Sequence, residues 1–410
     1  MRCTGRGFAV AAFAVAALLM SAVPVGAQQS DPAITGFKLD NPFTVVGALR
    51  PGPDGALWFT WLQDTAPLRT GVGRVTTSGV VTQWSVPSVW NRPALQGLAS
   101  GDGSIWTADA HDGKGFIGQW TVGGVLVQEF PLSGSAAGLT WGPDGALWFT
   151  GAVIRQPVTT GNSYIGRLAM DGTITTYPMP DPSNLAVDIT LGSDGAFWFV
   201  EEPGANVGRV TTTGVFTEYP IPNDPGNLLT QYANQMITLG SDGAVWLTTK
   251  LLPSVTRVSP TGDISSVPGP GDYIESVTTG SDANLWFTVN SSAGTHSIDR
   301  MTLAGQMLIY ALPDSFPPGL LGVITLGPDG KLWFGGSSVI GRLDPSIPPP
   351  APATSPTPAS GTSPATAPVP NTGADAATAG RVVGLLAVGV GVLALVGAWR
   401  LGLRRRRGSP

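Results

Sequence analysis

Short apolar runs, each followed by a turn, recur along most of the chain. The run at residues 237–239 leads into Gly-Ser-Asp-Gly at 240–243 and then into a segment that contains tryptophan. An Asp-Gly pair suits a tight hairpin, because glycine accepts positive φ. A Val-Gly-Arg-Val segment such as 207–210 comes next, and a last run ends in proline, as at 217–220. Each repeat therefore predicts four strands.

The tryptophan segment occurs seven times, at intervals of 40–50 residues: Trp58, Trp106, Trp148, Trp198, Trp246, Trp286 and Trp333. Seven units of four strands at this period are typical of a β-propeller, so the expected fold is an all-β, seven-bladed ring. We expect each tryptophan to pack between adjacent blades. The arginine of the Gly-Arg segment recurs too regularly to mark one site, which favours a structural role for Arg74, Arg167, Arg209, Arg257, Arg300 and Arg342.

The seventh repeat is incomplete, since a proline-rich stretch begins soon after residues 340–343. The segment Ile-Thr-Gly-Phe-Lys-Leu at 34–39 stands just before the first repeat. We expect residues 32–40 to supply the missing outer strand of the seventh blade. Such closure removes the open sheet edges that otherwise invite aggregation.

Composition agrees with a turn-rich β fold and limits the chemistry. The chain has 56 Gly and 37 Pro, and only 12% of its residues are charged, which disfavours long surface helices. One cysteine excludes a disulfide framework and a thiolate metal cluster, and two histidines make a His-rich metal site improbable.

Both ends of the chain differ from the repeats. Residues 1–27 have two early arginines, an apolar stretch and Val25-Gly26-Ala27, which together predict a cleaved secretory signal, with an uncleaved anchor as the alternative. The propeller is then expected at 28–347. Residues 348–368 are almost only Pro, Ala, Thr, Ser and Gly, the composition of a disordered, extended linker.

The C-terminus has three further parts. Residues 369–373 read Val-Pro-Asn-Thr-Gly, residues 374–403 contain an apolar membrane span at 382–399, and residues 404–410 are a basic cytoplasmic tail. This order resembles the sortase cell-wall sorting signal of Gram-positive bacteria, with Val369 in place of leucine and with Pro370, Thr372 and Gly373 matching. The resemblance implies sortase and peptidoglycan as partners and a protein displayed outside the cell. The alternative is a plain single-span membrane anchor.

Charge is divided along these boundaries. Residues 28–347 carry 14 Lys and Arg against 26 Asp and Glu, a formal net charge of about −12, although the whole chain has −5. A surface of this sign offers no basic stripe for phosphates, so binding of nucleic acid is not expected.

The repeat wording Ile-Thr-x-Gly-x-Asp-Gly-x-Leu-Trp-Phe-Thr, Ile-Gly-Arg-Val and Thr-Glu-Tyr-Pro-Ile-Pro resembles the virginiamycin B lyase (streptogramin lyase) family over residues 32–345. The resemblance implies a seven-bladed propeller and a magnesium-assisted elimination that opens the ester of a cyclic antibiotic. It also implies catalytic histidines just before the first strands of the sixth and seventh blades. Those positions hold Glu275 and Gly322 here.

Several residues remain as candidates for chemistry on the face that the family uses. His111 and His296 lie in expected loops of that face, where a solvated loop histidine is the simpler interpretation of each. Glu201 and Glu202 are expected to be exposed surface charges, with metal ligation as the weaker alternative. Asp188, Gln235 and Glu275 are expected at the channel mouth, where together they could bind a cation.

Aromatic residues on the same face favour ligand binding. Five of them fall in expected loops: Trp61, Trp90, Tyr232, Tyr273 and Phe316. Exposed rings around a polar opening suit a small molecule, a glycan, a peptide or another protein, and the alternative is that they pack on neighbouring loops. The primary hypothesis is a binding module, ahead of a lyase with displaced catalytic groups and a structural head of the cell wall. No cofactor is expected unless the lyase hypothesis holds, which would require magnesium.

Overall fold

The computed structural model describes residues 33–39, 41, 43–63, 69–86, 94–112, 114–153, 163–202, 206–222, 236–248, 254–271, 273–291, 294–313, 316 and 320–349. The expected signal, linker, sorting segment, membrane span and basic tail lie outside them. In the part that is described, no helix has the length and apolar character needed to cross a membrane.

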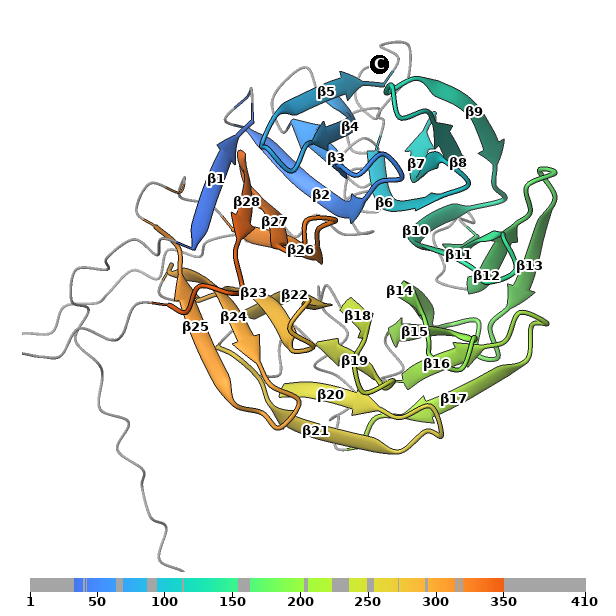
Figure 1. Cartoon of the computed structure of the whole chain (residues 1–410). Helices are drawn as coiled ribbons and strands as arrows, with labels where there is room; N and C mark the ends of the chain where they lie inside the picture. Colours follow the sequence, from blue (N-terminus) through green and yellow to red (C-terminus); the bar gives the residue numbers. More distant parts are fainter. Residues whose placement is uncertain are drawn as a thin grey trace, which may run out of the picture.

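In these residues, seven four-stranded antiparallel sheets form the blades of a ring (Figure 1). The first three blades are β2 (Thr44–Pro51), β3 (Leu57–Gln63), β4 (Arg69–Val75), β5 (Val81–Ser85); β6 (Ala94–Gly101), β7 (Ser104–His111), β8 (Lys114–Trp120), β9 (Leu126–Pro131); and β10 (Ser135–Trp141), β11 (Leu147–Ala152), β12 (Ser163–Leu168), β13 (Ile174–Pro178).

The next three blades are β14 (Leu185–Leu191), β15 (Phe197–Glu202), β16 (Asn206–Val210), β17 (Phe216–Pro220); β18 (Met236–Leu239), β19 (Val245–Thr248), β20 (Ser254–Val258), β21 (Ile264–Pro268); and β22 (Tyr273–Thr279), β23 (Leu285–Asn290), β24 (His296–Met301), β25 (Met307–Ala311). The first strand of each blade is innermost (Figure 1). The expected all-β, seven-bladed propeller is confirmed.

The seventh blade is built from both ends of the propeller. It contains β26 (Leu321–Leu326), β27 (Leu332–Gly336), β28 (Val339–Leu343) and, as its outer strand, β1 (Ile34–Lys38). Ile34 lies opposite Leu343 and Lys38 opposite Val339 in the antiparallel register. The ring of Phe37 stacks on that of Trp333 with centroids 5.3 Å apart. The predicted closure of the ring by the N-terminal segment is therefore confirmed.

One hydrogen bond recurs in every blade. The indole Nε1 of each repeat tryptophan donates to Oδ1 of the aspartate four residues earlier, at 2.9–3.1 Å, in Asp54, Asp102, Asp144, Asp194, Asp242, Asp282 and Asp329. In five blades Oδ2 of that aspartate accepts a second bond, at 2.5–2.6 Å, from Nε of Arg74, Arg167, Arg209, Arg257 or Arg300. The recurring arginines are thus structural in these blades, as expected.

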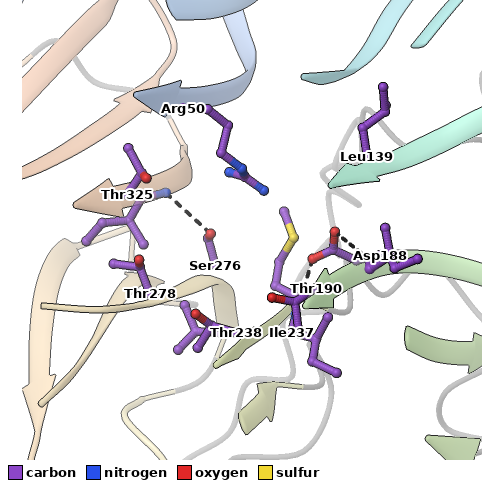
Figure 2. Close-up of a pocket in the computed structure, with 13 residues that line it drawn as sticks. Arg50, Leu139, Asp188, Thr190, Ile237, Thr238, Ser276, Thr278 and Thr325 are labelled. Carbon is purple, nitrogen blue, oxygen red and sulfur yellow. Dashed lines mark hydrogen bonds between the residues drawn. The ribbon is translucent and has the colours of Figure 1, made fainter. Parts of the chain in front are cut away.

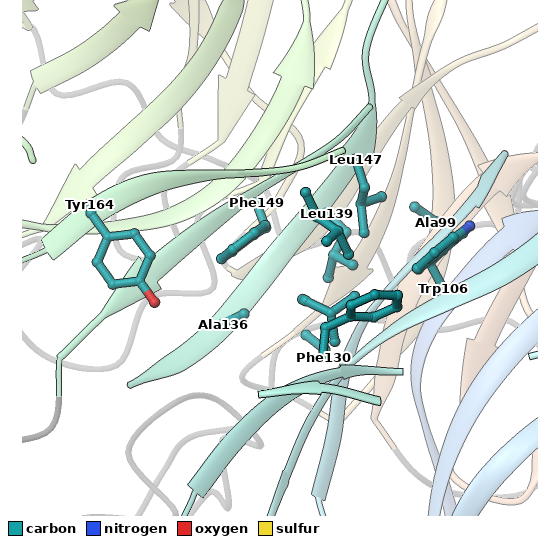
Figure 3. Packing of buried hydrophobic residues seen from close by; sticks show 11 residues of the cluster. Ala99, Trp106, Phe130, Ala136, Leu139, Leu147, Phe149 and Tyr164 are labelled. Atoms are coloured by element: carbon teal, nitrogen blue, oxygen red, sulfur yellow. The ribbon is translucent and has the colours of Figure 1, made fainter. Parts of the chain in front are cut away.

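The tryptophans occupy the interfaces between blades. Trp106 and Phe130 of blade two pack against Leu139 and Leu147 of blade three (Figure 3). All seven repeat tryptophans are at most 1% exposed. The hydrophobic core is therefore distributed around the ring as a series of interfaces.

The innermost strands are irregular near one end. The register shifts in β2, β6, β10, β14, β22 and β26, so that one or more extra residues stand between paired positions. A β-bulge of this kind bends the strand and redirects side chains. Asp188 lies in the bulge of β14 and Glu275 in that of β22. The bulges therefore decide which side chains reach the channel.

Removal of β1 tests the closure. A protein that begins at Pro42 loses a five-residue strand and the Phe37–Trp333 contact, so β28 becomes an open edge. The loss of several backbone hydrogen bonds, each worth about 1 kcal/mol, should lower the melting temperature by on the order of 10 °C. Differential scanning calorimetry against a protein that begins at Pro32, which keeps β1, measures this. Equal melting temperatures would contradict the closure role.

Candidate binding site in the central channel

One position of the inner strand is repeated around the channel wall. It is the residue paired with the blade tryptophan, and it is threonine in five blades: Thr140, Thr190, Thr238, Thr278 and Thr325. Blade two has Ala99 at this position, and blade one has Arg50. A polar hydroxyl is therefore the common choice at this level of the channel, and Arg50 is the only charged member of the set.

A cavity of about 130 Å³ occupies the axis at this level. Its polar lining consists of one guanidinium, one carboxylate and a group of hydroxyls, and its walls come from six of the seven blades. Figure 2 shows Arg50 and Asp188 directed toward the same space as the hydroxyls. The polar lining residues are Arg50, Asp188, Thr190, Thr238, Ser276, Thr278 and Thr325.

The carboxylate of Asp188 is held by two backbone amides. Oδ1 accepts from the amide of Ile189 at 2.9 Å, and Oδ2 accepts from the amide of Ile237 in the next blade at 3.2 Å. Burial raises the pKa of Asp188 above its ordinary value, although the charge of Arg50 and the two amides act in the opposite direction. The bulge of β14 and the start of β18 together fix the position of this group.

The guanidinium of Arg50 is held by its own strand. Nη1 donates to the carbonyl oxygen of Leu49 at 3.0 Å, and this is the only hydrogen bond of the Arg50 side chain to the described residues. Arg50 and Asp188 form no ion pair with each other, and neither is in contact with another charged side chain of the described residues. The remaining guanidinium donors are thus available on the cavity side.

Glu275, which was also expected at the channel mouth, differs in placement from Asp188. Glu275 is only 6% exposed, in the bulge of β22, and is not among the residues that line the cavity. Gln235 lies outside the described residues. Of the three residues predicted to bind a cation together, Asp188 lines the cavity and Glu275 does not, and the residues that line it include the cationic Arg50.

The expected aromatic opening is corrected at three residues. Trp61 does not lie in a loop: β3 extends to Gln63, so the indole is 6% exposed and donates to the carbonyl of Val72 at 3.1 Å. Phe316 is half-buried, because its ring stacks on Phe334 at 5.7 Å. Tyr273 is 37% exposed, but it is the first residue of β22 and does not lie in a loop. Trp90 and Tyr232 lie outside the described residues.

His111 is buried instead of solvated, which corrects the expectation of a loop histidine. It ends β7, stacks on Phe116 and is bonded on both ring nitrogens, Nδ1 to Asp112 at 2.9 Å and Nε2 to Glu129 at 2.8 Å. Burial opposes its charged form, but these two carboxylates outweigh burial and raise the pKa of His111. With both nitrogens engaged, His111 is poorly placed to exchange a proton with a ligand.

His296 is the first residue of β24 and is half-buried. Its Nδ1 lies 2.8 Å from Oδ1 of Asn290, which is 2% exposed and also bonds the backbone of Leu321 in the next blade. Burial lowers the pKa of His296, so the imidazole is neutral at neutral pH. His296 is thus the better placed of the two histidines for proton transfer.

Glu201 and Glu202 are not a pair of exposed surface charges, which corrects that expectation. Glu201 is fully buried, and its Oε2 accepts from the side-chain amides of Asn184 at 3.0 Å and Asn206 at 3.4 Å. Glu202 is partly buried, and its Oε1 has no hydrogen-bond partner in the described part of the chain. Burial raises the pKa of both carboxyls, assisted in Glu201 by the negative charge of Glu218.

Magnesium, which the family resemblance implies, does not fit the side chains that the structure describes. Among the described residues, no group of three or more His, Cys, Asp or Glu side chains is arranged to hold a metal ion. At the two inner-strand positions where the family resemblance places histidines, the chain has a buried glutamate and a glycine. No metal-dependent step is therefore derived for this chain.

The channel arrangement defines a seven-bladed propeller with a small polar site on its axis. The profile of the Virginiamycin B lyase family matches residues 14–227 and 229–347, so the chain belongs to this family. It is 28% identical over 201 residues to virginiamycin B lyase of Nocardia farcinica, covering 41% of this chain and 67% of that protein.

Two solved structures share the whole propeller. A streptogramin B lyase structure is 29% identical, with a TM-score of 0.63 over 76% of this chain and 97% of that one. A catalytically inactive histidine-to-alanine variant of virginiamycin B lyase from Staphylococcus aureus, solved with quinupristin, is 26% identical, with a TM-score of 0.60 over 76% and 98%. The resemblance seen in the repeats is therefore confirmed at the level of family and fold.

Arg50 was not predicted as a site residue from the sequence. The signal is present, since Arg50 stands eight residues before its blade tryptophan, where five other blades have threonine. What the sequence does not show is that this position faces the channel, which follows from the pairing of the first two strands and from the cavity lining.

A pH series tests the burial of Glu202. Burial raises its pKa from 4.5 to about 7, so the folded protein keeps a proton that the unfolded chain has already lost between these values. Stability therefore falls as the pH rises through this interval. We expect Glu202→Gln to be more stable than the native protein above about pH 7 and nearly equal to it near pH 4. Urea unfolding at several pH values measures the difference.

The control for this series is Asp263→Asn. Hydrogen bonds from Thr261 and Ser259 lower the pKa of the exposed Asp263, so its contribution is present at neutral pH and is lost as the pH falls. The two variants should thus change the pH profile in opposite directions. A difference between Glu202→Gln and the native protein that does not change with pH would contradict the buried, uncharged state.

Proposed function

We propose that this protein is an extracellular binding protein for a small polar molecule, held in the central channel by Arg50, Asp188 and the surrounding hydroxyls. The observation that carries the proposal is that Arg50 stands at the tryptophan-paired position where five other blades have threonine. The scaffold tolerates threonine or alanine at this level, so a guanidinium is not needed to build the blade. A charge withdrawn from water costs free energy unless it gains partners. A ligand would supply them.

The size of the cavity supports a small ligand. Drug-sized molecules occupy pockets of roughly 300–1,000 Å³, whereas this cavity has about 130 Å³. A cyclic depsipeptide of the streptogramin type would have to bind on a face of the propeller. The site proposed here and the site of the family's reaction are therefore different places on the same scaffold.

The extracellular part of the proposal rests on the two ends of the chain. The secretory signal at 1–27 and the sorting segment at 369–373 with its span and basic tail favour display on the cell surface, by sortase attachment or by the membrane span alone. Fractionation of cells that express Thr372→Ala bears on the choice between the two routes.

A thermal-shift experiment tests the channel site. The purified protein is heated with separate solutes that represent anions, cations, zwitterions and neutral sugars. A ligand at 100 times its dissociation constant stabilises the folded state by about 2.7 kcal/mol, which raises the melting temperature measurably. We expect at least one class to do so, and Arg50→Thr, which restores the common residue, to remove the effect.

The control is Arg69→Thr, because Arg69 is exposed at the start of β4, away from the channel. It should respond to the solutes as the native protein does. If no class of solute raises the melting temperature in a way that depends on Arg50, the binding function is wrong.

A second candidate function is an elimination reaction that uses His296, and the Asn290–His296 contact favours it. The neutral imidazole is oriented through Nδ1, and Nε2 has no hydrogen-bond partner in the described residues. Such a group can act as a general base. In an ester elimination it would take a proton from carbon while the carbon–oxygen bond breaks and leaves a carboxylate.

Incubation with a streptogramin B compound tests this candidate. Ring-opened product, followed by liquid chromatography and mass spectrometry, should form with the native protein and fall by about 10²-fold or more in His296→Gln, the usual effect of losing a general base. His111→Gln is the matched control, because both His111 nitrogens are already bonded. Absence of product, or equal rates in both variants, would exclude His296 as the base.

A further inference from the structure

The two charged groups of the channel face one cavity without neutralising each other. Asp188 is bonded by the amides of Ile189 and Ile237, and Arg50 by the carbonyl of Leu49. These backbone contacts keep the carboxylate on the β14 side of the cavity and the guanidinium on the β2 side (Figure 2). The cavity therefore presents a positive and a negative group at separate, fixed places.

We propose that the channel binds a small zwitterion, with its carboxylate on Arg50 and its ammonium group on Asp188. This inference rests on the proposed binding function and names the chemical class of its ligand. Each end of such a molecule meets the opposite charge, which gives charge-assisted hydrogen bonds at both ends. A molecule with one charge would leave either the guanidinium or the carboxylate without a partner.

The hydroxyls of the cavity complete both ends. A threonine or serine hydroxyl donates one hydrogen bond and accepts others, so it can serve a carboxylate or an ammonium group. Thr190 stands two residues after Asp188 on β14. Ser276 on β22 and Thr325 on β26 also line the cavity. An ammonium group has three donors, whereas each oxygen of Asp188 already accepts from one backbone amide. Thr190 and Thr238 directly follow the residues that supply these amides, so their hydroxyls are placed to accept from the ammonium group as well.

The volume sets an upper limit on the ligand. About 130 Å³ admits more than one water molecule but falls well below the pocket of a drug-sized ligand. Free amino acids and short amino acid analogues are zwitterions of a suitable size. An ammonium group beside Asp188 would favour its charged form, against the effect of burial, which raises the pKa of this carboxyl.

Isothermal titration calorimetry of the purified full-length protein tests the ligand class. The probes are glycine, β-alanine and γ-aminobutyrate, which separate the two charges by increasing distances. Acetate and methylammonium, each with one of the two charges, are the comparison probes. We expect one of the three zwitterions to bind at least about tenfold more tightly than either single-charge probe, because it makes both charge-assisted contacts.

Three variants identify the residues. Arg50→Thr and Asp188→Asn should each weaken binding of the preferred zwitterion by at least about tenfold. Arg69→Thr should leave binding unchanged. Since a change at the channel can also affect folding, circular dichroism and the melting temperature of each variant are measured first, and Arg50→Lys, which keeps the charge, should retain part of the affinity.

The outcomes separate this inference from the function on which it rests. If acetate binds as tightly as the zwitterions and Asp188→Asn keeps full affinity, the site takes an anion, and the zwitterion is wrong while channel binding stands. If methylammonium alone binds in an Asp188-dependent way, the site takes a cation, with the same consequence. If no probe, and no solute of the thermal-shift panel, binds in a way that depends on Arg50, both proposals are overturned.

Discussion

The propeller depends on the hydrogen bond between each blade tryptophan and the aspartate of the preceding turn. A buried indole N–H without a partner is costly, and the aspartate satisfies it while its second oxygen binds an arginine on the third strand. One carboxylate thus joins a turn and two strands. Blade six shows the strength of this constraint, because Ala283 adopts positive φ where other blades use glycine, and Asp282 still holds Trp286.

Because this constraint lies at the blade interfaces, other positions are free to vary. The third residue after the blade tryptophan is Trp61 in blade one, Asp109 in blade two and Glu201 in blade four, and all three are buried. Burial raises the pKa of Asp109 to about 7. The scaffold thus accepts either an aromatic ring or a carboxylate at this buried position. Departures from the repeat are therefore where function is to be sought, and Arg50 is such a departure.

Repetition explains what the sequence could predict. The seven tryptophans were sufficient to predict the number of blades and the packing of the tryptophans between them. The incomplete last repeat was sufficient to predict that residues 34–38 close the ring. Burial of single polar residues was not predictable, because it depends on the neighbouring strand. Gly208 leaves room for Glu201, since a Cβ there would lie 2.8 Å from Oε1. Trp61 was misplaced because β3 has seven residues and β27 only five, a difference that the repeat pattern does not show.

The two candidate functions depend on different parts of the scaffold. Chemistry on a face depends on loops and on the bulges of the inner strands, and the bulges of blades six and seven hold Glu275 and Gly322 where the family resemblance implies histidine. In the channel site, Arg50 and the threonines lie in the regular part of the inner strands, at the positions paired with the tryptophans, whereas Asp188 lies in the bulge of β14. A face can lose its catalytic residues without disturbing this pairing. Membership of a lyase family and a binding site on the axis are therefore compatible, and the residues of the channel have to be judged by their own chemistry.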